Sequence, residues 1–139
     1  MSEKIIVLVD IAHSNSAVAL LTKAKTHYAG KEIHLAYVMP YGNYSYVEPF
    51  VSKESQENAA QRANAELDAL THDVGLSKAS RHVLRGGIGD QVFELAKKLG
   101  ATVLVLNAVR LGSHYSTLGT HAAQIVRHAP CDVLIMRYF

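Results

Sequence analysis

The chain has 139 residues, of which 49% are apolar and 19% charged, with a net charge of +2. A chain of this length folds as about one domain and needs no metal or disulfide to do so, so we expect a single domain over residues 1–139. The 14 basic and 12 acidic residues are interspersed, which argues against a nucleic-acid partner because such proteins carry a basic stripe. The one cysteine, Cys131, excludes an intrachain disulfide and favours a reducing, cytoplasmic setting.

Membrane association is not expected either. The apolar segment 5–9 is too short for the core of a signal peptide. The longest apolar runs are far below the ~20 residues that a membrane-spanning helix needs.

The first half of the chain alternates strand and helix patterns. Residues 4–9 form a continuous β-branched run, which is typical of a strand covered by helices on both faces. A helix over 17–28 follows, then a second strand over 33–38 that Pro40 ends, since proline cannot donate to a ladder. The loop 39–52 is rich in tyrosine, and a loop of this length in a small domain indicates a functional or interface role.

The second half continues the alternation. The expected elements are a helix over 52–74, a weak strand over 80–84, a glycine turn over 85–90, a helix over 91–99, a strong strand over 101–106, a polar loop over 107–118, a helix from 119–120 to 128 and a last strand over 132–136. Pro130 forbids continuation of the last helix.

This order predicts an α/β fold with a parallel sheet, right-handed crossovers and helices on both faces. Such sheets bind ligands beyond the carboxyl ends of the strands, where the strand order reverses. The candidate site therefore comprises Val9-Asp10, residues 38–40, Arg85-Gly86 and residues 106–108.

Several motifs resemble the universal stress protein family. Gly119-Thr120 and the run 127–131 (Arg-His-Ala-Pro-Cys) match the carboxyl-terminal signature of that family, and Val9-Asp10 and residues 38–40 (Val-Met-Pro) match its first two strand ends. The resemblance covers essentially the whole chain. It implies a Rossmann-like sheet of five parallel strands in the order 3-2-1-4-5, and a homodimer formed through the last strand, residues 132–137.

The resemblance also implies a ligand. Nucleotide-binding members hold ATP or AMP, here with Mg²⁺ as an optional companion, and their Asp and second-strand backbone lie around adenine. Gly86 corresponds to a position near the ribose or phosphates. The implied binding residues are Asp10, Ile11, Val38, Met39, Pro40, Gly86, Asn107, Ala108, Gly119, Thr120 and His121. No catalytic residue and no metal ligand is assigned.

One motif of the nucleotide-binding branch is changed. That branch uses Gly-x2-Gly-x9-Gly-Ser/Thr, and counting back from Gly119 places Leu106 and Val109 at the two earlier glycines. Alignment by the strand end instead places Asn107 first, and some members carry a small polar segment there. The helix start at Gly119-Thr120 retains the free N–H groups that bind phosphate.

Simpler interpretations stay open. Thr120 could be only a helix cap, Asp10 only a helix-entry residue, and Gly86, Gly87 and Gly89 only a tight turn. The eight histidines lack the spacing of a zinc site. The first functional hypothesis is a stress-response protein regulated by ATP or AMP. The alternatives are an interaction module for an unidentified protein, without nucleotide, and a weak ATPase, although no Walker lysine is present.

Overall fold

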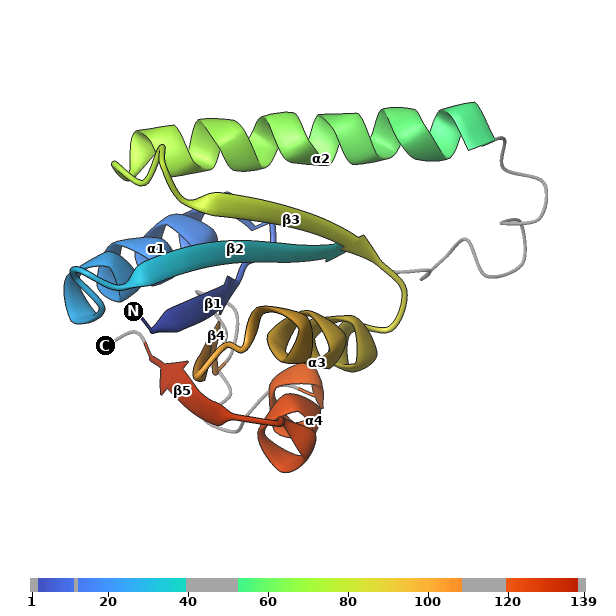
Figure 1. Ribbon diagram of the computed structural model, residues 1–139. Coiled ribbons are helices and arrows are strands. Elements are labelled where there is room, and N and C mark those ends of the chain that lie inside the picture. Colours follow the sequence, from blue (N-terminus) through green and yellow to red (C-terminus); the bar gives the residue numbers. More distant parts are fainter. Residues whose placement is uncertain (1–2, 12, 40–52, 109–119, 138–139) are drawn as a thin grey trace.

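The computed structural model describes residues 3–11, 13–39, 53–108 and 120–137. They form one five-stranded parallel sheet covered by helices on both faces (Figure 1). The strands are β1 (Lys4–Leu8), β2 (Glu32–Met39), β3 (Ser80–Arg85), β4 (Val103–Asn107) and β5 (Asp132–Met136), and the helices are α1 (Ser14–His27), α2 (Lys53–Asp73), α3 (Ile88–Leu99) and α4 (Thr120–His128). The predicted alternation is confirmed.

The strand order is β3-β2-β1-β4-β5, and every neighbouring pair is parallel. This confirms the expected order 3-2-1-4-5. The chain runs outward from β1 to β3 and then returns to the other side of β1 through β4. The strand order therefore reverses between β1 and β4, which is where open α/β sheets bind ligands.

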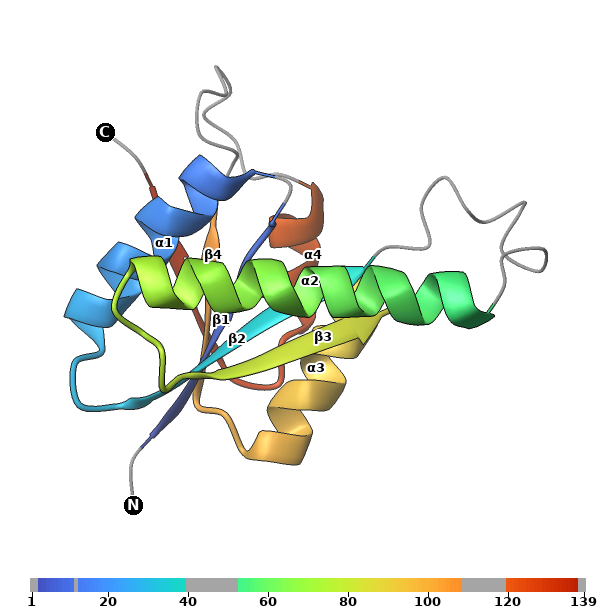
Figure 2. The same ribbon diagram turned by 90° about the horizontal axis from the view of Figure 1, so that it is seen from above.

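Two apolar cores sandwich the sheet. On one face α1 and α2 contribute Leu20 and Leu67 around Ile5, and on the other face α3 and α4 contribute Val92 and Ile125 around Ile6. Neighbouring residues of a strand point to opposite faces, so both isoleucines of β1 are fully buried. The view from above in Figure 2 shows α2 crossing over the sheet. Burial on both faces explains why β1 and β4 read as unbroken apolar runs.

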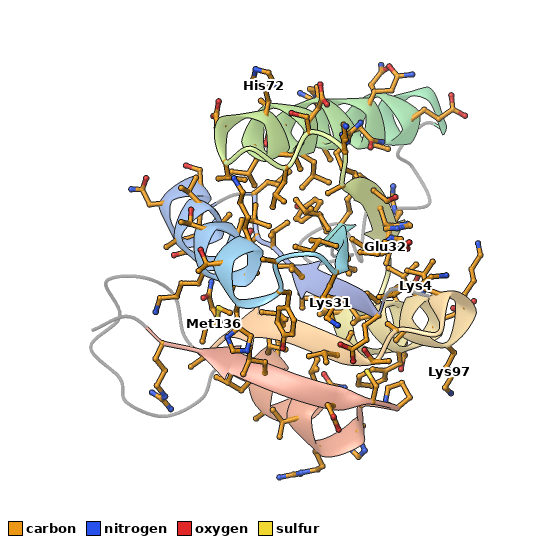
Figure 3. The ribbon with its side chains drawn as sticks, turned by 60° about the vertical axis from the view of Figure 1, so that its left-hand side comes forward. Lys4, Lys31, Glu32, His72, Lys97 and Met136 are labelled. Carbon is orange, nitrogen blue, oxygen red and sulfur yellow. The ribbon has the colours of Figure 1, made fainter. Side chains whose placement is uncertain are left out.

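Helix α2 packs on the sheet through a narrow stripe of apolar side chains. Ala63, Leu67 and Leu70 are buried, whereas the outer surface is polar and includes the exposed His72 (Figure 3). The helix ends where Gly75 adopts φ 75° and the amide of Leu76 donates to the carbonyl of Thr71 at 2.7 Å. A left-handed residue at a helix end favours glycine because it has no Cβ.

Several boundaries differ from the predicted ones. Helix α1 begins at Ser14 instead of residue 17, and α3 begins at Ile88 instead of residue 91. Strand β4 starts at Val103, two residues late, because the amide of Ala101 donates to the carbonyl of Ala96 and closes α3. The strand extends one residue further, to Asn107.

The three glycines near residue 87 do not form one tight turn, so that interpretation needs correction. Of Gly86, Gly87 and Gly89, only Gly86 has a positive φ, 132°. Gly87 precedes α3 with extended backbone, φ −68°. Gly89 lies inside α3 and is buried, and a Cβ there would approach the Gln124 side chain of α4 at 3.4 Å. Gly89 therefore lies where α3 packs on α4, and a Cβ there would make an ordinary contact.

Parts of two predicted loops fall outside the described residues. Met39 ends β2, while the tyrosine-rich stretch 40–52 is not described. In the second loop Asn107 and Ala108 are described and 109–118 are not. Among the helices that are described, none is long and apolar enough to cross a membrane.

Candidate functional site

Four predicted segments meet at the carboxyl edge of the sheet. Asp10 follows β1, Met39 ends β2, Gly86 follows β3 and Asn107 ends β4. Parallel strands place all their carboxyl ends at one edge. The topology therefore gathers residues that lie up to 97 positions apart in the chain, as the numbers 10 and 107 show.

Asp10 is held by His13, which was not among the predicted site residues. The Oδ2 atom of Asp10 lies 2.9 Å from Nδ1 of His13, and the side chains are 50% and 36% exposed. The amide of His13 also donates to the main-chain carbonyl of Asp10 at 3.1 Å. This turn leads directly into α1, so Asp10 does serve helix entry while its carboxylate stays accessible. The spacing of three residues between a carboxylate and a histidine was the available signal.

Asn107 connects the end of β4 to the first turn of α1. Its side-chain amide donates to the main-chain carbonyl of Ser16 at 3.5 Å, a long hydrogen bond. Ser16 itself is buried, at 6% exposure. Nothing local in the sequence indicates the role of Ser16, because a contact between positions 91 apart carries no local signal.

Main-chain hydrogen bonds fix the ends of the outer strands. The amide of Gly86 donates to the carbonyl of Met39 at 3.1 Å, and the amide of Ala108 donates to the carbonyl of Met136 at 3.1 Å. Val38 and Ala108 have buried side chains, so they can offer a ligand little beyond their main-chain groups. Ile11 packs partly buried against the core beside α1.

The helices that follow the strands begin at this edge, and α1 and α4 are two of them. Neither α1 nor α4 has an acidic residue in its first turn, so both retain the partial positive charge of a helix amino terminus. Thr120 is the first residue of α4, and His121 is exposed. Pro40 and Gly119, which were also predicted to bind the ligand, lie outside the described residues.

Leu106 cannot be a loop residue. It lies within β4, pairs with Ile135 of β5 and is 3% exposed. The first position at the edge of the sheet is therefore Asn107, which agrees with alignment by the strand end. The departure from glycine at this point places a side-chain amide where the altered motif would begin.

The charge of Asp10 also acts on β2. Burial raises the pKa of Tyr37, and the negative charges of Asp10 and Glu66 raise it further. Because the ordinary pKa of tyrosine, 10.0, already lies above physiological pH and the pKa of Tyr37 is higher still, Tyr37 remains a neutral phenol. Asp10 is thus a source of negative potential beside the end of β2, where the amino group of a base or a ribose hydroxyl could donate to it.

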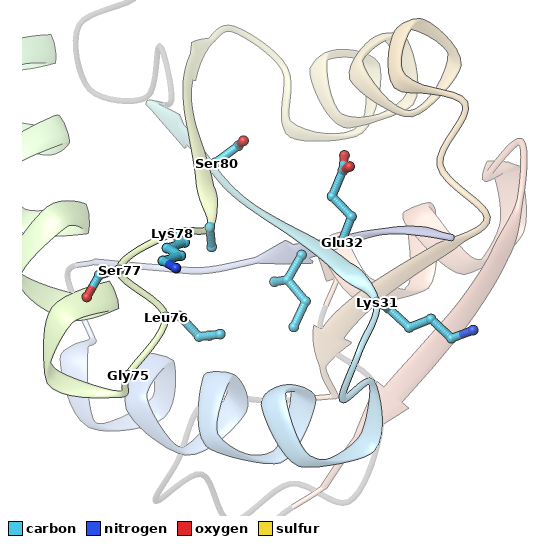
Figure 4. Close-up of a pocket in the computed structure, with 9 residues that line it drawn as sticks. Lys31, Glu32, Gly75, Leu76, Ser77, Lys78 and Ser80 are labelled. Atoms are coloured by element: carbon cyan, nitrogen blue, oxygen red, sulfur yellow. The ribbon is translucent and has the colours of Figure 1, made fainter. Parts of the chain in front are cut away.

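A surface pocket of about 430 Å³ lies at the opposite edge (Figure 4). It is formed by the amino ends of β2 and β3 and the turn after α2, and its lining residues are Lys31, Glu32, Ile33, Gly75, Leu76, Ser77, Lys78, Ala79 and Ser80. Open α/β sheets use the carboxyl edge for ligands, so this pocket is a rival location whose occupancy an experiment can distinguish. Across the described ranges, no three His, Cys, Asp or Glu side chains are grouped to hold a metal ion.

The known sequences that match this chain are universal stress proteins. The model of the universal stress protein family matches residues 1–137. Universal stress protein G of Shigella flexneri is 31% identical over 111 residues, which cover 76% of this chain and 77% of the relative. Universal stress protein G of Escherichia coli O157:H7 matches to the same extent.

Solved structures share the fold. Universal stress protein UspA from Lactobacillus plantarum has a TM-score of 0.74 at 23% identity, with 98% of each chain covered. A universal stress protein in complex with cAMP has a TM-score of 0.60 at 21% identity, with 98% of this chain and 97% of that chain covered. At these identities the likeness concerns the fold.

Proposed function

The chain belongs to the universal stress protein family, and we propose that it binds ATP or AMP as a regulatory ligand at the carboxyl edge of its sheet. The protein would act as a cytoplasmic homodimer in the stress response. Binding would stabilise one conformation or select a protein partner, without turnover.

The observation that carries this proposal is the placement of Asp10 and Asn107. They stand at the ends of β1 and β4, the two strands between which the order reverses. This is the position at which open α/β sheets bind nucleotides. A half-exposed carboxylate and a side-chain amide suit hydrogen bonding to the base and sugar.

The phosphates would lie near the start of α4. A helix amino terminus offers unpaired N–H groups together with partial positive charge, and the first turn of α4 contains no acidic residue. The structural relative solved with cAMP supports an adenine nucleotide as the class of ligand. Mg²⁺ does not form part of the proposal.

The homodimer would use β5. This strand is at one edge of the sheet, and Val133, Leu134 and Ile135 are only partly buried in the isolated chain. An edge strand with unpaired N–H and C=O groups is a template for pairing with another copy. The proposed interface is the last strand, residues 132–137.

An interaction module without nucleotide is the second candidate. The specific observation in its favour is Leu106, which is buried inside β4 where direct counting from Gly119 would place a glycine. On this account the edge would contact a protein instead of a nucleotide.

The test is the melting temperature of nucleotide-free protein with and without millimolar ATP or AMP, each measured with and without Mg²⁺. A ligand at about 100 times its Kd adds ~2.7 kcal/mol of apparent stability, which raises the melting temperature by several degrees in a domain of this size. GTP serves as the control. A shift with ATP or AMP that exceeds the shift with GTP supports the proposal, and equal or absent shifts favour the interaction module.

The dimer has a separate test, the mass in solution by light scattering. We expect twice the chain mass of 15.2 kDa, and we expect Ile135→Lys to reduce it because a charged side chain would be placed at the β5 interface. The matched control is Val126→Lys on α4, at the most exposed of the large apolar residues described (45%). A monomeric native protein would contradict the dimer without affecting the nucleotide proposal.

A further inference from the structure

Two histidines form a hydrogen-bonded pair across β2 and β3. Nδ1 of His34 lies 3.0 Å from Nε2 of His82, and the two rings stack with centroids 5.2 Å apart. The other ring nitrogen of His34, Nε2, lies 2.5 Å from Oε2 of Glu32. His34 is 5% exposed, and none of these groups belongs to the proposed nucleotide site.

The hydrogen atoms in this chain of contacts can be counted. An ionised carboxylate only accepts, so Nε2 of His34 carries a hydrogen and donates to Glu32. In a neutral His34 ring Nδ1 is then a bare acceptor, and Nε2–H of His82 donates to it. All three groups are satisfied with both histidines neutral.

One added proton is tolerated by the same geometry. If His34 becomes imidazolium, both of its N–H groups donate, one to Glu32 and one to the bare Nε2 of a neutral His82 in its other tautomer. A second proton leaves two N–H groups facing each other across 3.0 Å. The pair therefore accommodates one imidazolium and excludes two.

The surroundings oppose a charge on His82. Burial lowers the pKa of His82 below its ordinary value of 6.5, and the charges of His34 and of Lys98 on α3 lower it further. The hydrogen bond from His34 lowers the pKa of Glu32, against a smaller effect of burial, and the charges of His34 and of Lys4 on β1 add to the lowering. Figure 3 shows Glu32 near Lys4, at the end of the sheet where α3 carries Lys97.

We propose that His34 and His82 are an acid-sensitive clasp that holds β3 to β2 and opens when both histidines are protonated. Strand β3 is at the edge of the sheet and pairs only with β2 among the described strands. Residues 34 and 82 belong to the registered segment in which His34 pairs with Ser80 and Ala36 pairs with His82. Opening would release β3 together with α2, which precedes it and packs on it.

The direction of the pH effect follows from the lowered pKa of His82. Below pH 6.5 the opened state binds more protons than the closed state, so the closed state is favoured less as the pH falls. The equilibrium constant for opening should rise about tenfold for each pH unit below 6.5, until the pH reaches the pKa of His82 in the closed state. Above pH 7.5 the clasp stays closed.

The experiment is native-state hydrogen exchange of the β3 amides at pH 7.5 and 5.0, corrected for intrinsic exchange rates. We expect protection of β3 to be lower at pH 5.0 than at pH 7.5 in the native chain, by at most about tenfold per pH unit below 6.5. The decrease should be much smaller in His82→Gln, whose side-chain amide can donate to Nδ1 of His34 without titrating. The control is His72→Gln on the exposed surface of α2, which should behave as the native chain. Equal pH dependence in the native chain and in His82→Gln would overturn the clasp.

A second measurement on the native protein does not depend on a variant that folds. Imidazole nitrogen shifts in NMR report which ring atoms carry hydrogen. At pH 7.5 we expect Nε2 of His34 to be protonated and Nδ1 to accept, with His82 titrating below 6.5. Two histidines that titrate independently near pH 6.5 without change at β3 would refute the proposal.

Discussion

The side-chain amide of Asn107 at the end of β4 donates to the main-chain carbonyl of Ser16 in the first turn of α1, at 3.5 Å. The strand order reverses between β1 and β4. This bond therefore joins β4 to α1, the helix that follows β1. The hydrogen bond between Asp10 and His13 involves the residue directly before the same helix. The candidate site is therefore built on the junction of β1, β4 and the start of α1.

Asn107→Asp should weaken nucleotide binding and lower stability slightly. The substitution keeps the size of the side chain but replaces the donor to the Ser16 carbonyl with a carboxylate, which repels that carbonyl and can no longer donate a hydrogen bond to the base or sugar. We expect a loss of affinity on the order of tenfold, which corresponds to ~1.4 kcal/mol, measured by calorimetric titration with AMP and ATP. Asn107→Gln keeps the amide and should lose less. Equal affinity in all three proteins would remove Asn107 from the site.

Gly86→Ala should destabilise the protein by about 1–3 kcal/mol, because φ of 132° at Gly86 is a conformation that residues with a Cβ rarely adopt. The adjacent Gly87 has φ −68°, and a Cβ there meets only Asp90 at 3.6 Å, an ordinary contact. Gly87→Ala is thus the matched control, with an expected cost below about 1 kcal/mol at this helix cap. Urea unfolding measures both, and equal costs would show that the backbone at Gly86 is not the cause.

Leu67→Ala should cost about 2–5 kcal/mol in the free energy of unfolding. Leu67 is fully buried where α2 lies on the sheet, so truncation leaves a cavity. Val18→Ala on α1, where the residue is 38% exposed, should cost less than about 1 kcal/mol. Both values come from urea titration monitored by circular dichroism. A small cost at Leu67 would mean that α2 contributes little to the fold.

Cys131 should react slowly with a thiol reagent. Burial raises the pKa of its thiol, the charge of Asp132 raises it further, and a hydrogen bond with the backbone of Leu104 opposes this. Because the thiolate is the reactive form, we expect reaction with a disulfide reagent at pH 8 to be slower in the folded protein than in denaturant. Asp132→Asn should react faster than the native chain. Rapid reaction of the folded native protein would contradict this.

The same shift has a consequence for stability. The folded-state pKa of Cys131 lies above the unfolded value of 9.0, so the folded state holds the proton more tightly. The contribution is fully present below pH 9.0 and is lost as the pH rises through the folded-state pKa. Cys131→Ser removes the thiol, so the difference in alkaline stability between the native chain and this variant should change with pH above 9.0.

Local sequence patterns predict much of the fold. The apolar runs of β1 and β4 indicate burial on both faces, and Gly75, Gly100 and Pro130 mark helix ends. These signals predict the element order and, through the family resemblance, the strand order. They misplace boundaries such as that of α3, because the glycines at 87 and 89 weaken the helical pattern although Gly89 packs inside the helix.

The site is only partly predictable. Asp10 and Asn107 follow from their places after strands, whereas Ser16 and the pairing of His34 with His82 depend on contacts between residues 91 and 48 positions apart. His34 lies between the apolar residues Ile33 and Leu35 in β2, and nothing local reveals its partner on β3. Pairing across strands is a tertiary property.

The most direct test of the account maps the ligand on the protein. Amide chemical-shift changes in ¹⁵N-labelled, nucleotide-free protein are measured during titration with AMP and ATP. We predict saturable changes at Asp10, Val38, Gly86 and Asn107, with no comparable changes at Glu32 and Ser80. Changes confined to the pocket at the amino edge, lined by Lys31, Lys78 and their neighbours, or no saturable change at all, would contradict a nucleotide site at the carboxyl edge.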